Sequence, residues 1–238
     1  MIDDQALDRV RRPTVTRPLL GLTVLAVEDS LFACDALRLM CLYSGARLRR
    51  ADCLKSARRH LQVYRPTAVI VDIGLPDGSG TDLISELSCA IPRVSVILGT
   101  SGDSFAEDVA FAAGADGFLA KPVGNLGVFQ NAILQHLPKA LQPCGLRPIL
   151  SEPIEPDPVT FREDMAHMAE LLGGDVDDRM IDYVTLFLRG VARAADDDIL
   201  ESAASDVASA RSDGTPLMGP MSRLAGLVQA RLQESVAV

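Results

Sequence analysis

The sequence predicts an α/β fold, in which a doubly wound, five-stranded parallel sheet is followed by a smaller all-α helical domain. Short apolar runs rich in β-branched residues alternate with helical patterns over residues 21–137. Six prolines then fall within residues 138–158, which is the composition of a linker. Residues 159–238 carry only amphipathic helical patterns, so a separate helical domain is expected there.

Five strand–helix units follow one another in the first part of the chain. Strands are predicted at 22–27, 46–51, 67–71, 94–99 and 116–120, and the helices after them at 31–44, 55–64, 81–90, 104–113 and 128–137. Arginines interrupt strand 46–51, which favours an edge position. Repeated units of this kind join parallel strands through right-handed crossovers, so a doubly wound sheet follows.

The remaining segments are expected to lie outside the sheet. Residues 1–20 mix acids, arginines and prolines without apolar periodicity, and we expect a loosely held N-terminal arm or a short helix. The last 80 residues suit a small helical bundle or a helical hairpin that buries its apolar stripe by dimerising. Four amphipathic stretches are predicted there, at 161–172, 177–195, 196–210 and 217–232.

The charge of the chain is acidic and unevenly distributed. The formal net charge is -9, and residues 126–238 hold 9 Lys and Arg against 17 Asp and Glu. Binding to a phosphate backbone needs clustered cations, so nucleic acid is not expected as a partner.

Cysteine spacing and hydropathy indicate the cellular compartment of the protein. The five cysteines have no Cys-x-x-Cys spacing, which favours buried thiols in a reducing compartment over a disulfide scaffold or zinc site. No apolar run approaches about 18 residues, and the N-terminus lacks a signal-peptide pattern. We therefore expect a cytoplasmic protein without membrane insertion.

Reactive side chains follow four of the predicted strands. Glu28 and Asp29 follow the first strand, and Asp72, Thr100 and Lys121 follow the third, fourth and fifth. The carboxyl ends of parallel strands meet at one sheet edge, where open α/β folds bind ligands. Three acidic groups at this edge would repel one another without a cation, and their hard oxygens predict Mg²⁺. One ammonium at the same edge suits a phosphoryl oxygen.

Four sequence pieces carry a family resemblance. In this order and spacing, they make residues 21–137 similar to the receiver domain of two-component response regulators, which has a flavodoxin-like fold. The pieces are Val27-Glu28-Asp29-Ser30, Val71-Asp72-Ile-Gly-Leu-Pro76 with Gly80, Leu98-Gly-Thr100-Ser101, and Gly114-Ala-Asp-Gly-Phe118-Leu-Ala-Lys121-Pro122.

The resemblance implies how the acidic edge reacts. Asp72 would accept a phosphoryl group, and Lys121 would bind one of its oxygens. Asp29 and Asp72 would ligate Mg²⁺ directly. Glu28 would act through water, and Gly74 would supply its backbone carbonyl.

The resemblance also implies a switch. Thr100 would hydrogen-bond the phosphoryl group and pull its loop inward, and Phe118 would rotate into the vacated space. The peptide bond between Lys121 and Pro122 would be cis.

The helical part resembles a different module. Residues 159–200 are similar to the opening helices of histidine phosphotransfer domains, whose next helix carries His-x-x-Lys-Gly. The closest register here is Ser222-Arg-Leu-Ala225-Gly226, with serine for histidine and alanine for lysine. The resemblance implies a degenerate domain that serves for docking or dimerisation, and a generic interaction bundle is the alternative.

We therefore expect a response regulator that receives a phosphoryl group on Asp72 from a histidine kinase or phosphotransfer protein. It would signal through protein–protein contacts of the C-terminal helices, with a homodimer as one form. No enzymatic activity is expected beyond autophosphatase activity. Three other hypotheses stay open: a transcriptional regulator with an unrecognised DNA-binding domain, a receiver with a purely structural role, and a phosphatase with an aspartate nucleophile. The phosphatase would carry Asp-x-Asp after the first strand, where this chain has Glu28-Asp29.

Overall fold

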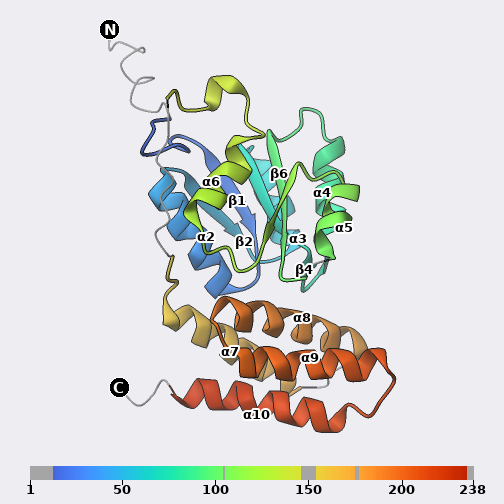
Figure 1. Cartoon of the computed structure of the whole chain (residues 1–238). Helices are drawn as coiled ribbons and strands as arrows, with labels where there is room; N and C mark the ends of the chain where they lie inside the picture. The colour runs from blue at the N-terminus through green and yellow to red at the C-terminus, as the bar shows by residue number, and fades with distance from the viewer. Residues whose placement is uncertain (1–12, 104, 146–153, 175–176, 235–238) are drawn as a thin grey trace.

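Five parallel strands form the central sheet of the first domain. The computed structural model describes residues 13–103, 105–145, 154–174 and 177–234 (Figure 1). The strand order is β2-β1-β3-β6-β7, so the predicted doubly wound sheet is confirmed and the arginine-rich strand does lie at an edge. The strands are β1 (Thr23–Val27), β2 (Arg47–Ala51), β3 (Ala68–Asp72), β6 (Val96–Ser101) and β7 (Gly117–Ala120).

Helices cover both faces of this sheet (Figure 1). Alternate residues of a strand point to opposite faces, so Val24 and Ala26 join one apolar core while Leu25 and Val27 join the other. On the first face lie α2 (Leu31–Ser44) and α6 (Leu126–Leu134), and on the second lie α3 (Leu54–Val63), α4 (Gly80–Cys89) and α5 (Ala106–Ala112).

A short hairpin after β3 was not predicted. Strands β4 (Gly74–Leu75) and β5 (Gly78–Ser79) pair antiparallel over two residues each, too short a ladder to leave an alternating pattern in the sequence. Gly80 follows this hairpin, and a Cβ there would lie 1.9 Å from the carbonyl oxygen of Asp72. Glycine at this position therefore lets the hairpin close against the end of β3.

The sheet domain begins before the first predicted strand. Leu19 is fully buried in the core beneath α2, and its backbone N–H donates to the Ser44 carbonyl at 2.9 Å. The part of the predicted arm at residues 1–12 lies outside the described residues. In the proline-rich segment, the chain forms one 3-10 turn, η1 (Lys139–Leu141), and residues 146–153 again lie outside the described residues.

The second domain is a four-helix bundle, which confirms the four predicted helical stretches. Its helices are α7 (Pro158–Leu172), α8 (Asp178–Ala194), α9 (Asp198–Ser212) and α10 (Met218–Glu234). Met165 and Met168 of α7 are fully buried in its core, as their spacing predicted. In Figure 1 the bundle lies below the sheet domain, with α7 and α8 nearer to it than α10. Phe32 of α2 belongs to the bundle core, which joins the two domains.

Candidate functional site

The strand ends bring the predicted side chains to one edge of the sheet. Asp72 is the last residue of β3 and lies beside Thr100 of β6 in the strand register. Glu28 and Asp29 follow β1, and Lys121 follows β7. The three acids and the lysine line one cavity, which α8 closes from the other side.

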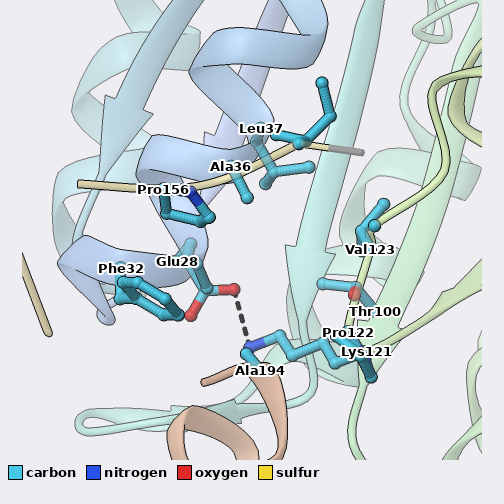
Figure 2. Close-up of a pocket in the computed structure, with 13 residues that line it drawn as sticks. Glu28, Phe32, Ala36, Leu37, Thr100, Lys121, Pro122, Val123, Pro156 and Ala194 are labelled. Carbon is cyan, nitrogen blue, oxygen red and sulfur yellow. Dashed lines mark ion pairs between the residues drawn. The ribbon is translucent and has the colours of Figure 1, made fainter. Parts of the chain in front are cut away.

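Lys121 binds two carboxylates at once. Its Nζ lies 2.8 Å from Asp72 Oδ2 and 2.7 Å from Glu28 Oε2. Figure 2 shows the ion pair with Glu28, with Thr100 and Pro122 next to it. Burial alone would lower the pKa of Lys121, but the two carboxylates outweigh it and hold the pKa above its ordinary value. The lysine is therefore a fixed positive charge at the end of β3.

The acidic cluster fits a divalent cation. Oxygen atoms of Glu28, Asp29 and Asp72 all lie within 4.8 Å of one another. Burial, with repulsion from neighbouring carboxylates, raises the pKa of Glu28 to about 8 and that of Asp29 to about 6. Glu28 Oε2 is buried, and the Lys121 ammonium at 2.7 Å is its charged partner. One ammonium among three crowded carboxylates leaves negative charge uncompensated, and a hard cation such as Mg²⁺ relieves it.

The other predicted residues surround this cluster. Gly74 lines the same cavity, and its N–H donates to Asp72 Oδ1 at 3.3 Å. The hydroxyl of Thr100 donates to the Leu119 carbonyl at 2.7 Å, so in this structure it is bound to the neighbouring strand. Phe118 is partly buried against the core under α5. The metal and switch roles of these residues stay predictions.

The predicted cis geometry of the Lys121–Pro122 bond is confirmed. This bond follows the last strand of the sheet, next to the ammonium group. Lys121 and Pro122 both line a second cavity of about 50 Å³, which Phe32 and Val123 share and which Ala194 of α8 closes (Figure 2).

Sequence reasoning missed the residues that the helical domain brings to the site. The Tyr183 hydroxyl donates to Asp29 Oδ2 at 2.7 Å. Asp164 is 2% exposed and accepts hydrogen bonds from Ser30, the N-cap of α2, and from the first two residues of that helix. Neither residue belongs to a motif, and a contact between two domains leaves no periodicity in either helix. The only available signal was an aspartate within the apolar pattern of the first predicted helix of the bundle.

Ser222, which stands for the histidine in the predicted phosphotransfer register, does not line the acidic cavity. Ser222 lies on α10, which is far from the sheet in Figure 1. The helix over the acidic cavity is α8, from which Leu186 and Gly190 line that cavity. The sequence Leu186-Phe-Leu-Arg189-Gly190 has the spacing of His-x-x-Lys-Gly, with leucine in place of histidine and arginine in place of lysine.

Comparisons with known proteins agree with the geometry of the first domain. Residues 24–133 match the family described as response regulator receiver domain. The KDP operon transcriptional regulatory protein KdpE of Escherichia coli is 33% identical over 103 residues, which are 42% of this chain and 45% of that protein. The transcriptional regulatory protein KdpE of Mycobacterium tuberculosis is 33% identical over 101 residues, with the same two shares. The matched segment thus spans less than half the length of these curated relatives.

Solved structures match the same part of the chain. A receiver domain of a signal transduction histidine kinase from Syntrophus aciditrophicus is 22% identical, with a TM-score of 0.46, over 52% of this chain and 98% of that one. The chemotaxis protein CheY4 from Vibrio cholerae is 22% identical, with a TM-score of 0.45, over 49% and 98%.

The first domain is a response regulator receiver domain, as the resemblance implied. The family match ends at residue 133, so the resemblance of the helical domain to phosphotransfer domains gains no support from it. Within the described parts of the chain, no helix is both long and apolar enough to cross a membrane.

Proposed function

We propose that this protein receives a phosphoryl group on Asp72 from a histidine kinase or a phosphotransfer protein. An oxygen of the Asp72 carboxylate attacks phosphorus, the new O–P bond forms as the N–P bond of the donor's phosphohistidine breaks, and the imidazole leaves. Lys121 donates a hydrogen bond to the attacking carboxylate and would offset charge on the transferred group. The ion pair between Lys121 and Asp72 is the observation that carries the proposal.

Mg²⁺ is the expected cofactor of this transfer. Asp29 and Asp72 would hold it directly, Glu28 through water, and Gly74 through its carbonyl. When bound, the ion would neutralise phosphoryl oxygens and relieve the repulsion between the carboxylates. The three clustered carboxylates support this assignment. We propose no catalytic turnover beyond slow self-dephosphorylation.

The helical domain is proposed to signal through protein–protein contacts, including a homodimer through its helices. We propose that it is a phosphotransfer-like bundle that has lost its histidine, because Leu186 occupies the position on α8 that lies over the acidic cavity. We propose the cytoplasm as its location, because all five cysteines are free. Cys34 and Cys41 are buried as predicted, whereas Cys53 is half-buried and Cys89 and Cys144 are exposed.

Treatment of the full chain with phosphoramidate and Mg²⁺ tests the phosphoacceptor. We expect a mass increase of one phosphoryl group, and we expect Asp72→Asn to abolish it. The matched control is Asp82→Asn, which makes the same substitution at an exposed aspartate on α4. This variant should be labelled like the original protein. Labelling that persists in Asp72→Asn would refute the assignment.

Transcriptional regulation through DNA is the second candidate. The two KdpE proteins are named as transcriptional regulators, but the similarity covers only 42% of this chain. The acidic second half of the chain opposes phosphate contacts. Titration of the full chain with duplex DNA at low and high salt distinguishes the two, and tight, salt-sensitive binding would favour the DNA-binding function.

A further inference from the structure

The helical domain contacts three of the loops around the acidic site. Each contact involves a loop that follows a strand end: the loop after β1, the hairpin after β3 and the loop after β6. The helices that make these contacts are α7 and α8, and we call this pair the lid (Pro158–Leu172 and Asp178–Ala194).

The first contact involves a proposed metal ligand. Asp29 Oδ2 accepts a hydrogen bond of 2.7 Å from the Tyr183 hydroxyl, and Asp29 Oδ1 accepts one of 3.1 Å from the Ser30 N–H. Both oxygens are therefore engaged by protein donors while α8 is docked. A carboxylate oxygen that binds a donor has less charge to offer to a cation, so docked Tyr183 and Mg²⁺ compete for Asp29.

The second contact fills the space above the phosphoacceptor. Leu186 packs so closely on Gly74 that a Cβ at that glycine would lie 2.4 Å from Leu186 Cδ2. The backbones of Gly102 and Gly190 also approach closely, because a Cβ on Gly102 would lie 3.6 Å from Gly190 Cα. The Arg193 guanidinium donates to the Gly102 carbonyl. These contacts hold α8 directly against the site.

The space that remains is small. The cavity between Asp72 and α8 has a volume of about 20 Å³. Such a volume holds about one water molecule. A phosphohistidine or even a small phosphodonor does not fit there, so transfer to Asp72 requires α8 to move.

The third contact fixes α7 to the receiver domain and is polar. Asp164 Oδ2 accepts a hydrogen bond of 2.7 Å from the Ser30 hydroxyl and one of 3.1 Å from the Phe32 N–H. Asp164 Oδ1 accepts a hydrogen bond of 2.8 Å from the Leu31 N–H. The N–H groups at the start of a helix lack partners within the helix and attract negative charge. A carboxylate from one domain therefore caps a helix of the other. Phe32 of α2 adds one apolar contact to the bundle core, so the interface combines polar and apolar contacts. Interfaces between domains of one chain are more polar than obligate interfaces, and relative motion of the two domains is expected.

We propose that the lid is an intramolecular competitor of phosphorylation: Tyr183 competes with the metal for Asp29, and Leu186 occupies the place of the phosphodonor over Gly74. The inference rests on the proposed function of Asp72. The phosphodonor protein and the lid then bind the same three loops and exclude each other. Phosphorylation keeps the lid open and exposes the face of α7 and α8 that the receiver domain now covers.

Phosphorylation rates test the lid on the full chain. The probe is phosphoramidate with Mg²⁺, and the variant is Asp164→Asn, which weakens the α2 cap without touching the cavity. The control is Asp206→Asn, which removes the same charge from an exposed ion pair with Arg223 between α9 and α10. Hydrogen bonds to a charged acceptor are strong enough that weakening them should raise the fraction of molecules with an open lid about tenfold. The phosphorylation rate should rise by the same factor. The control should react at the original rate.

A second pair of variants tests the lid independently, in case Asp164→Asn does not fold. The variant is Tyr183→Phe, which removes the hydroxyl that binds Asp29. The control is Tyr64→Phe, which removes a buried hydroxyl that lies elsewhere in the receiver domain and makes no hydrogen bond. Calorimetric titration with Mg²⁺ should show binding about threefold tighter in Tyr183→Phe, and unchanged binding in Tyr64→Phe. Hydrogen exchange should show that the N–H groups of Leu31 and Phe32 lose protection once the unchanged protein is phosphorylated.

The outcomes separate the two proposals. Equal labelling rates in Asp164→Asn and Asp206→Asn, with unchanged protection of Leu31 and Phe32, would overturn the lid and leave Asp72 as the acceptor. The absence of labelling in every variant would overturn the proposed function itself.

Discussion

Lys121 donates to Asp72 over 2.8 Å although 49 residues separate them in the chain. The same ammonium lies 2.7 Å from Glu28, so one cation compensates carboxylates from two different strand ends. The side chains of Lys121 and Glu28 are 11% and 1% exposed, and their mutual compensation is therefore little screened by solvent. This relationship ties the stability of the receiver domain to its chemistry.

Replacing the lysine tests that link. We predict that Lys121→Met lowers the free energy of unfolding by about 3 kcal/mol without metal, because two buried carboxylates lose their partner. Saturating Mg²⁺ should restore part of the loss. Urea denaturation with and without Mg²⁺ measures both, and exposed Lys55→Met is the control. Equal stability of the two variants would show that the ion pairs contribute nothing.

The effect of Mg²⁺ on stability is predicted to grow with pH. The pKa of Glu28 is raised from 4.5 to about 8 and that of Asp29 from 3.8 to about 6. The folded protein therefore keeps protons that the unfolded chain has lost. Between the ordinary and the raised pKa of each group, the stability of the protein without metal falls as pH rises. Mg²⁺ requires the deprotonated groups, so its stabilisation increases over the same window. Urea denaturation at about pH 6 and about pH 8 measures the difference, and a larger Mg²⁺ effect at the lower pH would contradict it.

The hairpin after β3 is predicted to tolerate no side chain at its end. In Gly80→Ala the new Cβ would meet the Asp72 carbonyl oxygen at 1.9 Å, and backbone cannot yield as a side chain can. We expect a loss of about 3 kcal/mol of unfolding free energy. Gly124→Ala, where a Cβ meets nothing within 4 Å, should change stability little. Thermal unfolding followed by circular dichroism compares the two, and equal melting temperatures would contradict the packing argument.

Close packing between Gly74 and Leu186 is predicted to couple the two domains. A Cβ at residue 74 would collide with the end of the Leu186 side chain, which can move with α8. We therefore expect Gly74→Ala to loosen the helical domain, and Leu186→Ala in the same chain to relieve the collision. Proteolysis rates of the single and double variants form a double-mutant cycle. Strictly additive effects would show that the two positions do not interact.

The sequence predicted the receiver domain well because each of its signals is local. Asp72, Thr100 and Lys121 end runs of strand residues, and a parallel sheet necessarily gathers strand ends at one edge. The hairpin at Gly74 escaped notice because two residue pairs are too few for a pattern. Tyr183 and Asp164 could not be predicted, since their partners depend on how two separately folded domains dock. Docking is fixed by surface shape and a few polar contacts, to which periodicity is insensitive.

Mapping of the phosphoryl group after treatment with phosphoramidate and Mg²⁺ tests the central claim most directly. Borohydride reduces an acyl phosphate to an alcohol, which marks the modified aspartate as homoserine for peptide mass spectrometry. We predict homoserine at residue 72 alone. Homoserine at residue 29, or phosphate on a side chain outside the acidic cluster, would contradict the assignment.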